Sequence, residues 1–192
     1  MSEYSRLPDS ELLTRCLAED ATAWETLVHR YQRLIASITF KFGFPQEDAA
    51  DVLQAVFLTL FQQLASLRQQ AKLSSWIITV TVRECWKMRA RRGQTDSLDA
   101  PDWNPANDPA DDSHLQMEEG ILALQRQHLL RQAVEVLPDR CRELLKRLFY
   151  TDSPPSYAEL SQQLGIPTAS IGPTRARCLD KLKENLSEAE FF

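Results

Sequence analysis

Two groups of residues near the C-terminal end have the types and spacing of a DNA-reading motif. Ser156 and Glu159 form an S-x-x-E capping box, which marks the start of a helix. Gly165 stands where that helix must end, because glycine adopts positive φ without steric cost. A second helix, capped by Thr168, would carry the basic residues Arg175, Arg177, Lys181 and Lys183. This pattern predicts a helix-turn-helix, whose second helix enters the DNA major groove. An ordinary helical hairpin with a solvated basic face fits the same residues.

The start of the first helix and the second helix of this motif hold the candidate contacts to bases and phosphates. The candidates are Ser156, Thr168, Ser170, Thr174, Arg175 and Arg177. Gly172-Pro173 falls in the first turns of this helix, and Pro173 lacks an N–H and crowds the carbonyl of Ala169. The helix therefore either begins near Pro173 or is kinked there.

A second constellation combines positive charge with aromatic rings. Positive side chains follow phosphates and rings stack on unpaired bases, at about 1–3 kcal/mol per stacked base. The candidates are Arg68, Lys72, Ser74, Trp76, Arg83, Trp86, Lys87, Arg89 and Arg91. The two tryptophans lie about 100° apart around a helix, so we expect Trp76 in the core and Trp86 partly exposed. The alternative is a solvated basic helix end with two structural tryptophans.

A third group lies on a helix expected from about Glu47 to Leu64. Its apolar residues occupy nearly every side, although an inward stripe needs only some of them: Val52, Leu53, Val56, Leu60 and Leu64. The surplus apolar residues and their polar neighbours are the candidates for partner binding: Asp48, Asp51, Gln54, Phe57, Leu58 and Phe61. A wide apolar face indicates a docking surface, unless the helix is central and covered by its own neighbours.

Helices must position all three groups, so we predict an all-α fold of two small domains. Asp20 can cap a helix with apolar residues at i, i+3 and i+4 spacing, which ends at Gly43-Phe44-Pro45. A loop is expected over 65–73 and a helix over 74–91, although its β-branched run Ile77–Val82 favours a strand by propensity. In the second part, one helix is expected around residues 121–137 and another from Pro138 at its first position.

The domain limits follow from an acidic, proline-containing segment. Residues 94–114 contain three prolines and a run of aspartates, which oppose a packed core, so this segment reads as a flexible linker. The domains are therefore predicted at 9–93 and 115–187.

Composition narrows the classes of function. Net charge is −5 over 192 residues, but residues 61–93 are strongly basic and 94–125 contain no Lys or Arg, so a local basic stripe can still bind a polyanion.

The sequence also excludes several kinds of site. The four cysteines are scattered, so we predict buried or free cytosolic thiols, with no disulfide framework, metal site or cofactor: Cys16, Cys85, Cys141 and Cys178. No apolar run approaches a membrane span, and no signal peptide is evident at Met1–Tyr4. Paired carboxylates in a plausible pocket and a Gly-rich phosphate loop are missing, so no enzyme is predicted.

Taken in order, these motifs resemble those of the extracytoplasmic-function (ECF) sigma factors, small two-domain specificity subunits of bacterial RNA polymerase. The resemblance covers about residues 9–187. It is carried by 51–57 (Asp-Val-Leu-Gln-Ala-Val-Phe), by Ser75-Trp76-Ile77 with the cluster 89–92, by Leu137-Pro138 with Leu144-Leu145 and Tyr150, and by 156–160, 164–166 and 175–177.

The resemblance implies a cytoplasmic bacterial protein that binds core RNA polymerase at its clamp and flap surfaces, and promoter DNA as duplex and as melted single strand. The helix of Asp51 and Phe57 would grip the clamp helices, and 65–73 with the following helix would open and hold the −10 element. The helix-turn-helix would read the −35 element, and the linker would thread the RNA path. An anti-sigma factor is an expected further partner, and membrane insertion is not expected.

Two residues depart from the family pattern. Family members often carry Asn where Arg83 stands and an acidic residue where Lys87 stands, which implies a different −10 preference. The alternative function is an autonomous helix-turn-helix regulator that binds duplex DNA as a dimer.

Overall fold

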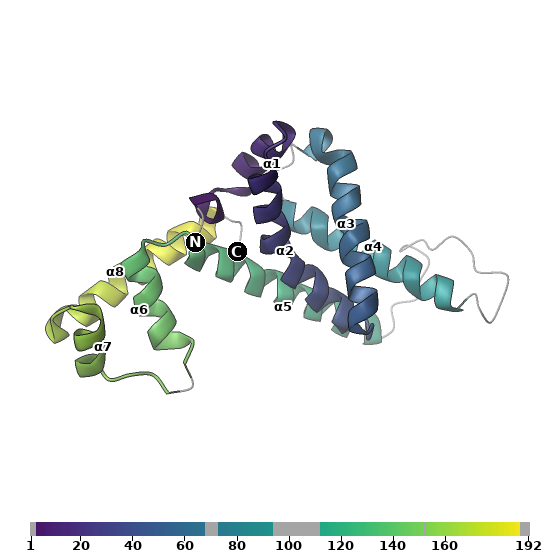
Figure 1. Cartoon of the computed structure of the whole chain (residues 1–192). Coiled ribbons are helices and arrows are strands. Elements are labelled where there is room, and N and C mark those ends of the chain that lie inside the picture. Colours follow the sequence, from purple (N-terminus) through teal and green to yellow (C-terminus); the bar gives the residue numbers. More distant parts are fainter. Residues whose placement is uncertain (1–2, 68–72, 94–111, 152, 189–192) are drawn as a thin grey trace. The chain divides into compact units, whose positions relative to one another are not determined.

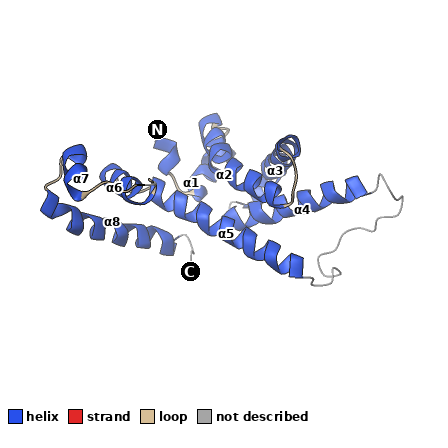
Figure 2. Ribbon diagram, turned by 90° about the horizontal axis from the view of Figure 1, so that it is seen from below, coloured by secondary structure: helices blue, strands red, loops and turns tan. Residues whose placement is uncertain are grey.

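The computed structural model describes residues 3–67, 73–93, 112–151 and 153–188, and within these ranges every regular element is a helix, which confirms the all-α prediction (Figure 1; Figure 2). The chain divides into two compact units, Met1–His128 and Leu129–Phe192. The first unit holds η1 (Glu3–Arg6), α1 (Asp9–Leu17), α2 (Ala21–Lys41), α3 (Gln46–Leu67), α4 (Leu73–Gly93) and the first part of α5 (Asp112–Glu135). The second holds the rest of α5, α6 (Asp139–Phe149), α7 (Tyr157–Leu164) and α8 (Thr168–Glu188).

Helix α2 is the centre of the first unit and packs against α1, α3 and α4. Asp20 caps it as predicted, because its carboxylate accepts hydrogen bonds from the backbone N–H groups of Thr22 and Ala23. Leu27, Ile35 and Ile38 on its inner face are fully buried. Their recurrence at helical spacing is the amphipathic pattern that identified this helix from sequence.

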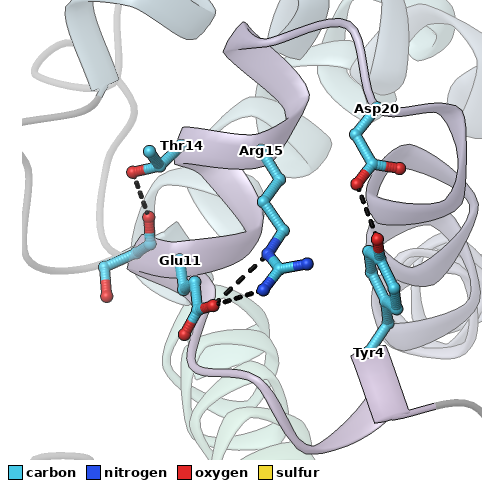
Figure 3. A network of polar contacts seen from close by, with 6 residues as sticks. Tyr4, Glu11, Thr14, Arg15 and Asp20 are labelled. Atoms are coloured by element: carbon cyan, nitrogen blue, oxygen red, sulfur yellow. Dashed lines mark hydrogen bonds and ion pairs between the residues drawn. The ribbon is translucent and has the colours of Figure 1, made fainter.

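Polar contacts tie the first residues of the chain to α1 and α2 (Figure 3). The Tyr4 hydroxyl donates to the Asp20 carboxylate at 2.8 Å and lowers its pKa. Arg15 pairs with Glu11 at 2.8 Å, and its guanidinium lies 4.9 Å from the centre of the Tyr4 ring. Behind them, Arg30 pairs with Asp9 at 2.5 Å. These contacts fix η1 and α1 onto α2.

The β-branched run in α4 is helical, as predicted. Ile77, Val80 and Thr81 are buried, so tertiary packing overrides strand propensity here. The hydroxyls of Thr79 and Thr81 donate to the carbonyls of Ser75 and Ile77, one helical turn earlier. The Thr81 bond satisfies a buried hydroxyl, whereas Thr79 is exposed to solvent.

The amino-terminal part of α5 belongs to the first unit, so the structure divides the chain later than the predicted linker. Met117, Ile121 and Leu124 pack against the first core, and Gln125 donates to the Ser75 hydroxyl at 3.3 Å. The His128 ring lies 4.7 Å from the Tyr31 ring. Residues 94–111 of the predicted linker lie outside the described residues, and its last residues, 112–114, are the start of α5. The predicted limits of the functional domains stay a prediction.

Helix α3 is long and apolar enough to cross a membrane by length and composition, contrary to the expectation that no segment approaches this limit. Val52, Val56 and Leu60 are nevertheless buried between α2 and α4 of the same unit. A central helix of a protein core passes the same test of length and hydropathy. The structure therefore accounts for much of the apolar content of α3 by packing.

The second unit contains the predicted helix-turn-helix. Ser156 and Glu159 form both hydrogen bonds of the capping box, and Gly165 ends α7 in the left-handed region at φ 61°. Helix α8 begins at Thr168, so Pro173 lies inside it rather than at its start. Pro138 is the N-cap of α6, one position before the predicted one.

Cys141 and Cys178 form a disulfide, which corrects the prediction of free thiols for this pair. Cys141 lies on α6 and Cys178 on α8, with 5.2 Å between their Cα atoms and 37 positions between them in sequence. The spacing of the cysteines in sequence did not predict this pair, because the contact between α6 and α8 forms only in the folded unit. Closing a chain loop of this length stabilises a fold by about 4 kcal/mol in the chain-entropy model. Cys16 and Cys85 are free, as predicted.

The Glu159 carboxylate of the capping box gives the second unit a pH-dependent stability. The backbone N–H and hydroxyl of Ser156 lower its pKa below the ordinary value of 4.5. Its contribution is complete above 4.5 and is lost as pH falls through the lower folded value. We expect Glu159→Gln to lower the melting temperature of this unit at pH 7, with a difference that shrinks below pH 4.5.

Far-UV circular dichroism melts at both pH values measure this effect. Glu118→Gln, at an exposed position of α5 in the first unit, is the control and should melt like the natural chain. Identical melts of the natural chain and Glu159→Gln at pH 7 would contradict a stabilising capping box.

Candidate nucleic-acid and partner-binding surfaces

The exposed stripe of α3, here called the α3 surface, consists of Asp51, Gln54, Leu58 and Phe61. Leu58 and Phe61 are 56% and 66% exposed and lie three residues apart, on the same side of the helix. Phe61 rests edge-on against the Trp24 ring, with 5.8 Å between ring centres. The stripe therefore presents two apolar side chains on a fixed helix, with a carboxylate and an amide beside them.

Two residues predicted for this surface are elsewhere, which corrects their assignment. Phe57 is buried with 8% exposed and packs against Trp24, because the inward face of α3 is wider than five residues. Asp48 is also 8% exposed, and its carboxylate pairs with Arg92 of α4 at 2.5 Å. Arg92 also lies over the Phe44 ring, so Asp48 helps to join α3 to α4.

Helix α4 carries the basic surface of the first unit, here called the α4 surface: Arg83, Lys87, Arg89 and Arg91, all exposed. Arg83, Lys87 and Arg91 recur every four residues and so share one side of the helix. Lys87 forms an exposed ion pair with Glu84 at 2.8 Å. Positive groups in one row can follow a phosphate backbone.

Both predicted tryptophans of this region are half-buried. Trp86 packs edge-on against Phe42 at 5.3 Å between ring centres, and the Arg89 guanidinium lies 5.5 Å from its ring. Trp76 packs at the edge of the core of the first unit, as Trp86 does, so the expected contrast between a core Trp76 and a partly exposed Trp86 is not seen. Ser74 in α4 is also half-buried. Arg68 and Lys72 lie outside the described residues.

A shallow pocket of about 370 Å³ connects the α3 and α4 surfaces. Asp51, Gln54 and Leu58 line one side, and Glu84, Lys87, Met88 and Arg91 line the other. Sequence reasoning assigned these residues to two separate constellations and did not select Glu84 or Met88. The structure brings them together because α3 and α4 pack side by side.

The α8 surface consists of the predicted reading residues Thr168, Ser170, Thr174, Arg175 and Arg177. Thr168, Arg175 and Arg177 are exposed, and Ser170 and Thr174 are half-buried. Arg177 donates to the Pro173 carbonyl at 3.4 Å, so its guanidinium lies along the helix. The Ser156 hydroxyl is engaged in the capping box. Ile171 and Cys178 hold the opposite side of α8 in the core.

Part of the first unit matches a known protein family. A family model described as sigma-70 region 2 matches residues 27–95, the range that contains the α3 and α4 surfaces. An ECF RNA polymerase sigma factor, RpoE of Cereibacter sphaeroides, is 24% identical over 97% of this chain and 100% of its own length.

The ECF sigma-E factor of Escherichia coli K12 is 30% identical over 52% of each chain. SigM of Mycobacterium tuberculosis, another ECF sigma factor, is 33% identical over 40% of this chain and 39% of its own length. The chain therefore spans about half the length of this E. coli relative. These matches support an ECF sigma factor. The alternative of an autonomous regulator is not favoured.

The chain also exposes aromatic side chains that sequence reasoning did not assign to a site. Phe40 on α2 is 52% exposed, and Phe149 with Tyr150 at the end of α6 are 61% and 56% exposed. The periodic pattern of apolar residues identifies the buried side of a helix, so it did not select these exposed aromatic residues as a site. Within the described residues, no group of His, Cys, Asp and Glu side chains could hold a metal ion.

Proposed function

We propose that the chain binds core RNA polymerase through the α3 surface, opens the −10 element with the α4 surface and reads the −35 element with the α8 surface. The observation that carries this proposal is the match to sigma-70 region 2 over 27–95, because this range contains two of the three surfaces. In this role the chain directs initiation by cytoplasmic bacterial polymerase and performs no catalytic step itself. An anti-sigma factor is the expected regulatory partner.

The chemistry of each surface suits its proposed task. Leu58 and Phe61 offer apolar area to a protein partner, and Asp51 and Gln54 offer polar contacts at its rim. The charges of α4 can hold the phosphates of a separated strand, and Trp86 supplies a ring nearby. Arg175 and Arg177 offer the guanidinium groups that read guanine in duplex DNA.

Transcription from genomic DNA by purified core polymerase tests the whole proposal. Adding this chain should produce discrete transcripts that core polymerase alone does not make, and their start sites should share two upstream elements. A housekeeping sigma factor is the control for polymerase quality. Transcripts no different from those of core polymerase alone would contradict the proposed function.

The acidic segment should restrain the free protein from binding DNA. Its aspartates can compete with phosphates for the basic surfaces, and this competition weakens as salt screens it. We expect deletion of residues 96–111, which leaves α5 intact, to increase binding of the free chain to duplex DNA at low salt.

Fluorescence anisotropy across a salt series measures this effect. A matched variant keeps the length of the segment and replaces its aspartates by asparagine. It should bind as tightly as the deletion if charge is the cause. Unchanged affinity of both variants at low salt would mean that the segment acts only as a tether.

A further inference from the structure

The disulfide between Cys141 and Cys178 lies at the centre of the second unit. Cys178 is 1% exposed on the core side of α8, whereas Cys141 on α6 is half-buried. Three buried residues belong to the same core: Leu144 from α6, Leu160 from α7 and Ile171 from α8. The cross-link therefore encloses the whole stretch from α6 through α7 to the reading helix.

A unit this small has a limited core, so a covalent link has a large effect on it. The core around the disulfide is small and consists of Leu137, Leu144, Leu145, Leu160, Ile166 and Ile171, with Cys178. Small domains gain little from hydrophobic burial, and a cross-link reduces the entropy of their unfolded chain. Making or breaking this one bond should therefore decide how completely α8 is ordered.

The other two cysteines are poor competitors for the same chemistry. Burial raises the pKa of both Cys16 and Cys85 to about 11. Thiol–disulfide exchange requires the thiolate, which is scarce at neutral pH for such groups. Cys85 is also fully buried between helices of the first unit. Oxidation should therefore be confined to the pair in the second unit.

We propose that Cys141 and Cys178 are a reversible thiol–disulfide modification site, and that oxidation stabilises the unit that presents the α8 surface. Glutathione and thioredoxin keep most disulfides reduced in the cytoplasm. In a family of cytoplasmic proteins, the fraction of this cysteine pair that is oxidised should therefore follow the ratio of reduced to oxidised thiols. The surface-facing member, Cys141, is where a small molecule meets the pair.

The exchange needs only a low-molecular-weight disulfide such as oxidised glutathione. The Cys141 thiolate attacks one sulfur of that molecule, forms a mixed disulfide and releases the first glutathione thiolate. The Cys178 thiolate then attacks the Cys141 sulfur and releases the second. Two protein thiols are oxidised, two glutathione thiols are formed, and the two thiol protons pass to solvent or to the released thiolates. Reduction follows the same steps in reverse.

The consequence for DNA rests on the proposed function. In the oxidised form, Arg175 and Arg177 are exposed on a helix whose inner side is covalently fixed. In the reduced form, the same helix is held by non-covalent contacts only: the apolar core and the bond from the Asn185 amide to the Ala133 carbonyl. Duplex DNA binding should therefore persist to a higher temperature in the oxidised form.

The full chain equilibrated with glutathione at different ratios of reduced to oxidised form tests the proposal. Mass spectrometry after alkylation should show concerted loss of two thiols, at 141 and 178, and their full return with excess reduced glutathione. Oxidation should raise the melting temperature of the second unit by about 10 °C or more. Trp24, Trp76 and Trp86 lie in the first unit and no tryptophan follows residue 128, so tryptophan fluorescence does not report the second unit and should melt unchanged. Far-UV circular dichroism follows both units.

Variants provide the controls. Cys141→Ala should melt at one temperature in both buffers, and Cys16→Ala should respond like the natural chain. Should Cys141→Ala fail to fold, the oxidised and reduced natural chain still give the comparison. Four free thiols in oxidised glutathione, a disulfide that excess reduced glutathione cannot open, or identical melts of the two forms would each overturn the proposal.

A DNA arm separates this proposal from the proposed function. Random-sequence duplex at low salt is the probe, at a temperature between the melts of the two forms, where only the oxidised chain should bind through α8. If the melts differ by redox state and Arg175→Ala leaves oxidised binding unchanged, the switch stands and the reading role of α8 fails.

Discussion

Replacing Leu58 and Phe61 together by alanine should reduce the affinity of the chain for core RNA polymerase by about 100-fold or more, at little cost in stability. Both side chains are more than half exposed, so their removal leaves no internal cavity of the size that core truncations leave. Large apolar side chains at the centre of an interface commonly contribute about 2 kcal/mol each. Asp51→Arg should weaken binding further by reversing a charge beside them.

Two aromatic residues of the same unit are matched controls for this prediction. Phe40→Ala removes a comparably exposed ring from α2 and should leave polymerase affinity unchanged. Phe57→Ala removes a buried ring and should lower the melting temperature instead. Surface plasmon resonance with immobilised core polymerase measures affinity, and circular dichroism measures folding. Natural affinity in the Leu58/Phe61 variant, or equal loss in Phe40→Ala, would place the contact elsewhere.

Substitutions on the α8 and α4 surfaces, the two proposed DNA-binding surfaces, should cause different defects. Arg175→Ala removes a contact worth about 1–3 kcal/mol of base discrimination and should relax preference in the −35 element. It should affect closed duplex and leave pre-melted templates active. Arg83→Ala with Lys87→Ala should do the reverse, because these charges would hold the separated strand of the −10 element. They should slow opening of a closed promoter and matter less for upstream duplex contacts.

Permanganate footprinting of unpaired thymines on duplex and on artificially bubbled promoter distinguishes the two classes. Trp86→Ala should share the opening defect, while Trp86→Phe keeps a ring against Phe42 and should retain part of the activity. Lys181→Ala, an exposed basic residue further along α8, is the control for loss of charge alone. The same defect for Arg175→Ala and Lys87→Ala on both templates would contradict two separate modules.

The sequence predicted most of the helices because their signals are local. Asp20, Ser156 and Gly165 mark helix ends through bonds to their own neighbours or through a backbone angle, so no tertiary information is needed. The Ile77–Val82 run was harder, since its propensity favours a strand. It was predicted as a helix because the basic segment that follows it is helical in pattern and no partner strand is available.

The features that sequence reasoning missed depend on contacts between distant segments. The link from Cys141 to Cys178 and the burial of Phe57 require knowledge of which helix faces meet. The position of the division between units depends on which core receives Met117, Ile121 and Leu124, and the acidic segment before them carries no such information. The candidate site residues stay a prediction, and the burial of Asp48 and Phe57 could not be predicted because an apolar helix has no unique inward side.

Proline 173 gives the two ends of α8 different mechanical properties. Without an N–H at this position, the carbonyl of Ala169 loses its usual helical partner, so the first turn is held to the rest of the helix by fewer bonds. Local opening requires less free energy where such bonds are missing, and fluctuations concentrate there. Residues 168–172 can thus adjust to the width of a groove by small changes in backbone angles, while the stretch around Cys178 stays fixed. If α8 reads duplex DNA as proposed, a first turn that deforms easily and a fixed helix behind it would let the same side chains fit promoters that differ in local shape.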